Sequence, residues 1–248
     1  MKLFLAVLLL SFLAEARVFD MNSEKFAAYF RGNYGPTSIG KGAFEKASAF
    51  NETYNNELKT ITAGEFGFVY AASFMNTKFA IEVIRPPSLK GTNATDANDN
   101  SLYSLDSDIS AVIPKIGFEF NLKKWKAARL FLNSNFGTGT LILSNAYTFT
   151  TAGTALTGKT DFTEEGRSTS TMIEGNLGIE FLMFDTTTMT LDIGYRSLKF
   201  TTITHNRTAS TLMGDKVKGD PMLNTDGTAR EIDLSGAYAS LGFRFWLF

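Results

Sequence analysis

The stretch Ala237-Tyr238-Ala239-Ser240-Leu241-Gly242-Phe243-Arg244-Phe245 decides the fold class, because apolar side chains stand at every second position of it. The positions between them hold tyrosine, serine, glycine and arginine. A period of two residues is the pattern of a β-strand with one apolar and one polar face. The segment therefore predicts a strand, and the 3.6-residue period of an amphipathic helix is almost missing from Lys25 onward.

Seven further runs with the same period precede this strand, and we expect a strand in each. They span residues 26–33, 65–70, 79–84, 112–122, 128–136, 173–181 and 189–196. Three connections are short (73–77, 123–126 and 185–188), whereas four are long and polar (35–60, 86–108, 144–168 and 204–231). Long and short connections alternate, which is typical of a barrel with tight periplasmic turns and long extracellular loops. Alternation in residues 146–151 leaves ten strands as an alternative to eight.

The two faces of these strands predict which side meets lipid. The apolar face carries too much side-chain volume for the narrow interior that about eight strands enclose. The other face is rich in glycine and nearly balanced in charge, as buried ion pairs require. We therefore expect a membrane-spanning, antiparallel, up-and-down all-β barrel whose lumen holds a charge network. Its predicted members are Arg31, Glu65, Glu82, Lys115, Glu119, Arg129, Glu174, Glu180, Asp192, Arg196 and Arg244. The alternative is a soluble sandwich with these side chains in water.

The composition excludes several classes of protein. The 248 residues include 24 basic and 25 acidic ones, which argues against a nucleic-acid binder with a basic face. The chain has no cysteine, so disulfides, thiol catalysis and cysteine-ligated metals are excluded. The mean hydropathy of -0.03 is what an ordinary soluble protein shows. The same average results when apolar and charged residues alternate along barrel strands.

The N-terminus has the pattern of a secretory signal peptide. Lys2 precedes an apolar run that begins at Leu3, and the triplet Ala14-Glu15-Ala16 follows it. We expect cleavage after residue 16 and one barrel domain over residues 17–248. An exported chain without cysteine fits a bacterial envelope, so we expect an integral protein of the Gram-negative outer membrane.

Three residues have expected places at the barrel rims or the lipid interface. Trp125 and Trp246 map to the same end of the barrel, so we expect both as interfacial anchors in an aromatic girdle. Pro114 stands on the outward face of a strand, where a closed barrel has no free edge for it. We expect Pro114 near the outer rim or at a bulge.

The end of the chain resembles a known family. The run Leu241-Gly242-Phe243-Arg244-Phe245 is similar to the closing strand of small outer-membrane barrels of the OmpW, OmpX and OmpA type. Chains of this kind end in phenylalanine, as Phe248 does, although here three residues follow Phe245. The resemblance implies that Phe243, Phe245 and Phe248 form the insertion signal read by the barrel-assembly machinery. It also implies contact with outer-membrane lipid and lipopolysaccharide.

The sequence offers little for catalysis or metal binding. The only histidine, His205, is followed at the second position by Arg207 instead of the serine of a His-x-Ser pair, and Ser210 lies further along the loop. Residues 96–100 begin like a calcium loop, but neither the glycine nor the final glutamate follows. We therefore predict no enzyme, no cofactor and no metal.

Two functions remain open, with a lipid-modifying enzyme as a remote third. The first is a non-enzymatic structural or surface-interaction barrel, closed by its charge-paired lumen. The second, which the OmpW resemblance implies, is a narrow channel for small hydrophobic molecules. Six apolar residues on the inward face would line a dry pocket with a lateral exit: Val69, Ile84, Ile113, Phe131, Leu198 and Phe200.

Overall fold

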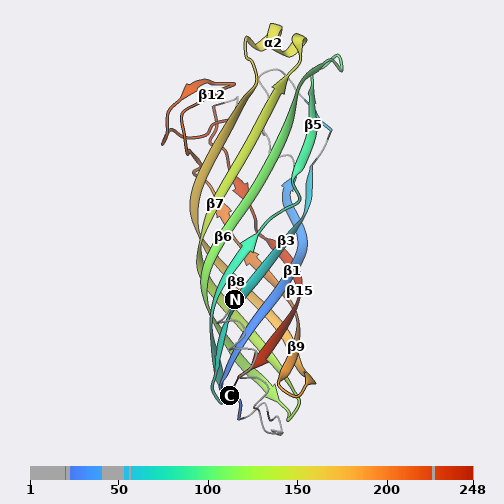
Figure 1. The fold of residues 1–248 in the computed structure, drawn as a ribbon, viewed down its shortest axis with the longest axis vertical. Coiled ribbons are helices and arrows are strands. Elements are labelled where there is room, and N and C mark those ends of the chain that lie inside the picture. Colours follow the sequence, from blue (N-terminus) through green and yellow to red (C-terminus); the bar gives the residue numbers. More distant parts are fainter. Residues whose placement is uncertain (1–19, 21–22, 41–52, 56, 225–226, 248) are drawn as a thin grey trace, which may run out of the picture.

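The computed structural model describes residues 20, 23–40, 53–55, 57–224 and 227–247 (Figure 1). The expected signal peptide over residues 1–16 and the terminal Phe248 lie outside the described residues. In the described part of the chain, no helix is long and apolar enough to cross a membrane.

Eight strands form one antiparallel ring, and the predicted all-β barrel is confirmed. Each strand pairs with its neighbours in the ring, and the last strand pairs back with the first. The ring consists of β1 (Phe26–Gly40), β3 (Leu58–Ala71), β4 (Met75–Ile84), β6 (Ser101–Lys124), β7 (Ala128–Phe149), β8 (Phe162–Phe184), β9 (Thr187–Ser197) and β15 (Gly236–Trp246). Closure leaves the ring without free strand edges, as a strand structure in hydrocarbon requires.

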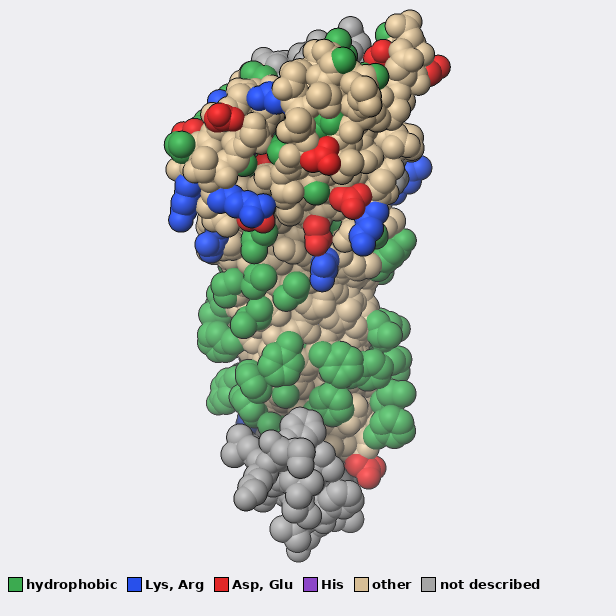
Figure 2. Space-filling model, turned by 45° about the horizontal axis from the view of Figure 1, so that its top comes forward, with side chains coloured by type: hydrophobic (Ala, Val, Ile, Leu, Met, Phe, Trp, Pro, Cys, Tyr) green, Lys and Arg blue, Asp and Glu red, His purple; other side chains and the backbone are tan. Residues whose placement is uncertain are grey.

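The strands turn their apolar face outward, as the sequence predicts. In β3, the outward Phe66 is 58% exposed and the inward Glu65 only 3%. Figure 2 shows the apolar side chains as a belt around the visible face, with acidic and basic side chains gathered above it. Exposed apolar side chains on this scale identify a surface that contacts lipid, since soluble proteins rarely expose such large apolar patches.

Three strands continue far beyond the apolar belt. The long strands β6, β7 and β8 rise together to the end that carries α2 (Thr151–Thr157) (Figure 1). Short strands join them: β2 (Thr53–Tyr54), β5 (Leu89–Thr95), β10 (Lys199–Phe200), β11 (Thr204–His205), β12 (Ala209–Thr211), β13 (Gly214–Lys216) and β14 (Ile232–Asp233). The predicted loop over residues 144–168 is therefore too long, because β7 and β8 remain paired as far as Tyr147 and Phe162. The alternation at residues 146–151 lengthens a strand of the ring and adds no ninth one.

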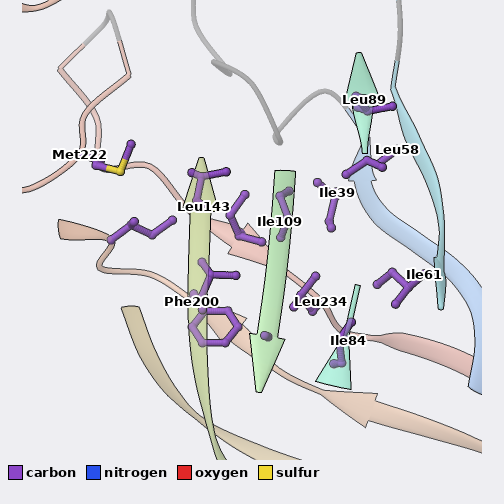
Figure 3. Packing of buried hydrophobic residues seen from close by; sticks show 14 of the residues in the cluster. Ile39, Leu58, Ile61, Ile84, Leu89, Ile109, Leu143, Phe200, Met222 and Leu234 are labelled. Carbon is purple, nitrogen blue, oxygen red and sulfur yellow. The ribbon is translucent and has the colours of Figure 1, made fainter. Parts of the chain in front are cut away.

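An apolar core fills the interior of this upper part. Side chains from the strand walls and from the segment after β9 meet inside the ring (Figure 3). Phe200 and Leu198 lie against Gly139 of β7, where an added Cβ would be 3.2 Å from Phe200 Cζ and from Leu198 Cδ1. Glycine at this position therefore allows the two large side chains to approach the backbone closely.

Pro114 corrects one expectation. It pairs with Ile81 in the ladder between β4 and β6, in the middle of the belt, and not at the outer rim. No register shift marks a bulge there, because the ladder between β6 and β7 runs in one register from Val112 to Lys115. Ile113 and Pro114 have no ladder partners on β7, so the missing proline N–H falls where the pairing is already interrupted.

Candidate functional site: the lumen

A lower layer of ion pairs fills the lumen near the ends of β6, β7, β8 and β15. Glu119 and Glu180 each lie 2.6 Å from Arg129 Nη2, and Arg244 Nη1 lies 3.2 Å from Glu180. Arg244 also pairs with Glu119, and Lys78 Nζ is 3.5 Å from the same carboxylate. Glu119 therefore faces three bases, and none of these side chains is more than 5% exposed.

An upper layer lies further up the lumen and is centred on Lys115. The Nζ atom of Lys115 lies 2.8 Å from Glu65 and from Glu82, and 3.3 Å from Glu174. Arg196 Nη1 approaches Glu82 to 2.8 Å from β9. One ammonium thus joins three carboxylates that come from three different strands.

Arg31 completes the upper layer from β1. Its guanidinium pairs with Glu65, lies 2.8 Å from Glu174 and 3.2 Å from Asp192. The Tyr29 hydroxyl donates to Glu65 from the position below. Ion pairs with this much burial are stable only when each charge finds opposite charges and hydrogen bonds, and the arrangement provides both.

All eleven predicted lumen charges are buried, and each lies in an ion pair with another of them. Sequence reasoning missed a twelfth, Lys78, because the alternation in this strand was recognised only from Phe79 onward. Extending it by one residue toward the N-terminus would have found Lys78, which is 3% exposed. With Lys78 included, the network holds six acids and six bases, so its formal charges cancel.

Asparagine and tyrosine side chains, which no sequence pattern singles out, add hydrogen bonds to the charge network. Asn33 donates to Glu82 at 2.8 Å, and Asn135 donates to Glu174 at the same distance. Asn176 donates to the hydroxyl of Tyr238 at 3.0 Å. The amides saturate acceptors that the bases leave free, which lowers the cost of burying the carboxylates.

The two tryptophans differ in exposure. Trp125 is 44% exposed, and Lys123 Nζ lies 5.2 Å from its ring centre. The expectation for Trp246 as an interfacial anchor is wrong, because its side chain is 4% exposed and its indole N–H donates to Thr188 at 3.0 Å. Trp246 occupies an inward position opposite Ala27, whose small side chain leaves room for the indole.

Of the expected insertion signal, the structure places Phe243 and Phe245. Both lie on the outward face of β15, where their rings flank Phe30 at centroid distances of 5.3 and 6.0 Å. These rings belong to the apolar belt, and Phe248 lies outside the described residues.

The expectation that six inward apolar residues line a dry pocket is wrong. All six side chains are buried. Ile84, Ile113, Leu198 and Phe200 belong to the packed upper core, and Figure 3 shows Ile84 and Phe200 within it. Phe131 lies in the lower lumen instead, where Cζ of Arg129 is 4.8 Å from the centre of its ring.

Neither motif considered for chemistry has the partners that it would need. His205 is buried beside β8, whereas Ser210 lies on the exposed β12 hairpin. Asp96 accepts the backbone N–H groups of Asn98 and Asn100 and closes a turn. The bonds from Asn100 hold the pKa of the Asp96 carboxyl below its usual value. Among the described residues, no group of three acidic or histidine side chains is placed to hold a metal ion.

Comparisons with known proteins return structures only: no family model and no curated protein matches the chain. The outer membrane protein OprG from Pseudomonas aeruginosa is 10% identical, with a TM-score of 0.48 over 93% of this chain and 99% of that chain. Ail, the attachment invasion locus protein of Yersinia pestis, is 10% identical, with a TM-score of 0.43 over 90% and 99%. The outer membrane protease OmpT from Escherichia coli is 9% identical, with a TM-score of 0.33 over 89% and 91%.

The closed antiparallel ring and its exposed apolar belt give the chain the fold of a small outer-membrane β-barrel.

Proposed function

We propose that the protein is a closed, non-enzymatic barrel of the Gram-negative outer membrane, acting as a structural or surface-interaction protein. One observation carries the proposal: side chains fill the interior at two heights, first as the paired charge network and above it as the apolar core. The void beside Asn33 and Arg196 measures about 10 Å³. A void of that size holds about one water molecule.

The energetics of the charge network support a permanent closure. Opening a path past Lys115 would separate an ammonium from three carboxylates in a region of low dielectric constant. Breaking a buried ion pair costs about 3–5 kcal/mol when one partner stays behind. Passage of a hydrated solute would disturb several such pairs together, so the open state would be scarcely populated.

The proposal implies which molecules the barrel would contact in the outer membrane. Outer-membrane lipid and lipopolysaccharide would contact the apolar belt and the charged band above it. The barrel-assembly machinery would insert the chain. Interactions at the cell surface would fall to the extracellular half, in which the exposed threonines Thr148 and Thr169 stand on the outer face of β7 and β8.

Permeability tests the closed state. We expect proteoliposomes that contain the refolded protein to swell in an isosmotic solution of a small sugar no faster than liposomes without it. A general porin refolded in the same lipid is the positive control. Swelling that increases with the amount of protein would contradict the closed barrel.

A second candidate, a narrow route for small hydrophobic molecules, is favoured by the seam between β1 and β15. Ladder pairing of the two strands ends at Tyr34 and Ala239. Just beyond, Gly35 and Ala237 line both an outer groove of about 670 Å³ and the small inner void. The wall between lipid and interior is thin at this point, and a lateral exit would lie here.

A disulfide across the seam separates the two candidates. The chain has no cysteine, so Pro36→Cys with Ala237→Cys introduces the only possible pair. If the seam is an exit, oxidation should abolish uptake of a small apolar dye into proteoliposomes, and reduction should restore it. The closed barrel predicts no protein-dependent uptake in either state.

A further inference from the structure

The chain's only histidine, His205, lies near the start of the segment that covers the upper core, in β11. His205 is 3% exposed and pairs with Gly166 of β8. Its backbone N–H donates to the backbone carbonyl of Asp220 at 2.8 Å, and its carbonyl accepts from the backbone N–H of Gly219 at 2.9 Å. The residue therefore joins the edge of a ring strand to the turn that follows β13.

The segment held in this way closes the apolar core from above. Residues 203–224 and 227–234 contribute Ile203, Met222, Ile232 and Leu234 to the core, and each of these four side chains is at most 1% exposed. Figure 3 shows Met222 and Leu234 on this segment, and both belong to the same buried cluster as Leu143 and Phe200. If the segment moved away, water would reach these apolar side chains.

Four charged groups lie within electrostatic reach of the imidazole. They are Glu164 of β8, Arg230 before β14, Asp220 in the turn and Lys216 of β13. Glu164 already binds Arg230 at 2.6 Å and accepts the Tyr147 hydroxyl. Oδ2 of Asp220 accepts the backbone N–H of Val217 at 2.9 Å.

The imidazole has one nitrogen without a partner. Nδ1 of His205 is buried and makes no hydrogen bond. A proton added to it would create an imidazolium beside Arg230 and Lys216, while both facing carboxylates are already engaged. A buried charge without a dedicated partner is expensive.

We propose that residues 203–224 and 227–234 form an acid-released lid, in which protonation of the buried His205 frees this part of the chain from β8 and exposes the upper apolar core. The lid goes beyond the proposed function, since the eight-stranded ring below it stays closed at either pH. Opening of the lid would expose apolar surface on the extracellular side. At neutral pH, with the lid closed, this surface stays buried.

The direction of the effect follows from burial. Burial lowers the pKa of His205 below its usual value, because the charged form loses hydration. The pKa in the released segment is about 6.5, so only the released state gains protons just below that pH. The closed lid is therefore fully stable above about pH 6.5 and loses stability as the pH falls from there toward the lower pKa of the closed state.

Spin labels can report the position of the lid, because a chain without native cysteine accepts them at chosen sites only. One label at Met213→Cys on the lid and one at Thr148→Cys on β7 report the distance between the lid and β7. We expect a narrow distribution at about pH 7.5 and a longer, broader one at about pH 5. A pair at Lys90→Cys and Thr148→Cys, which does not include the lid, should give the same distribution at both pH values.

Variants of two residues identify the group that responds. His205→Gln should abolish the acid-induced lengthening. Since this change could loosen the lid by itself, Lys216→Gln provides a second test: removing a facing base should reduce the lengthening at acid pH and leave the neutral distribution unchanged. An unchanged distance at acid pH in the parent protein would overturn the lid. Full acid-induced lengthening in His205→Gln would overturn the role of the histidine.

Discussion

Glu119→Ala should lower the free energy of unfolding by about 3–5 kcal/mol, because it leaves buried charges without their partner. The side chain of Glu119 is fully buried and faces Arg129, Arg244 and Lys78. After the substitution, Glu180 alone remains to balance two guanidinium groups. Urea unfolding of the protein in lipid vesicles, followed by tryptophan fluorescence, measures the change.

A matched control is the exposed pair of Glu57 and Lys59, whose charged atoms lie 3.1 Å apart. Surface ion pairs contribute between 0 and about 1 kcal/mol, so Glu57→Ala should change little. Equal, small effects of both substitutions would mean that Glu119 is solvated, and the assignment of inner and outer faces would then be reversed.

Ile81→Arg should destabilise the protein by about 2–4 kcal/mol, the cost of a guanidinium at the middle of a bilayer. Ile81 is 54% exposed and stands midway along the outward face of β4, between Phe79 and Val83. In water, an exposed isoleucine would tolerate this change, since surface substitutions usually stay within about 0.5 kcal/mol. The same unfolding experiment in vesicles measures the difference.

The control for this substitution lies on a strand that leaves the belt. Thr148→Arg places the same charge on the exposed face of β7, far above the apolar side chains. We expect it to leave the unfolding curve unchanged. A large loss at Thr148 or none at Ile81 would show that the belt does not mark the position of the membrane.

Period-two alternation was sufficient to predict the ring. A strand that faces lipid on one side and charges on the other alternates strictly, so Phe66 and Glu65 identify their faces without any structure. The charge network followed for the same reason, since a narrow lumen accepts charges only when they balance. Which acid meets which base could not be predicted, because contacts such as that of Arg196 with Glu82 join strands far apart in the sequence.

The upper half was predicted poorly, for physical reasons. Outside the bilayer a strand has no lipid to face, so alternation weakens and the continuation of β7 to Phe149 looked like a loop. Trp246 stands two residues after the inward Arg244, so its side chain must point to the same, inward face of the strand. The expectation of an interfacial anchor considered only that tryptophan is aromatic and lies near a barrel end, and not on which face of the strand it falls. Packing of the core around Phe200 depends on Gly139, and such tertiary contacts leave no periodic signal.

The central claim is that the lumen is sealed, and single-channel recording in a planar bilayer tests it most directly. At neutral pH, the refolded protein should insert without a reproducible conductance step, because Lys115 and Arg129 stay paired across the lumen. Insertion is verified separately by the different electrophoretic mobility of folded and boiled samples. A reproducible single-channel step from verified barrels would contradict the sealed lumen.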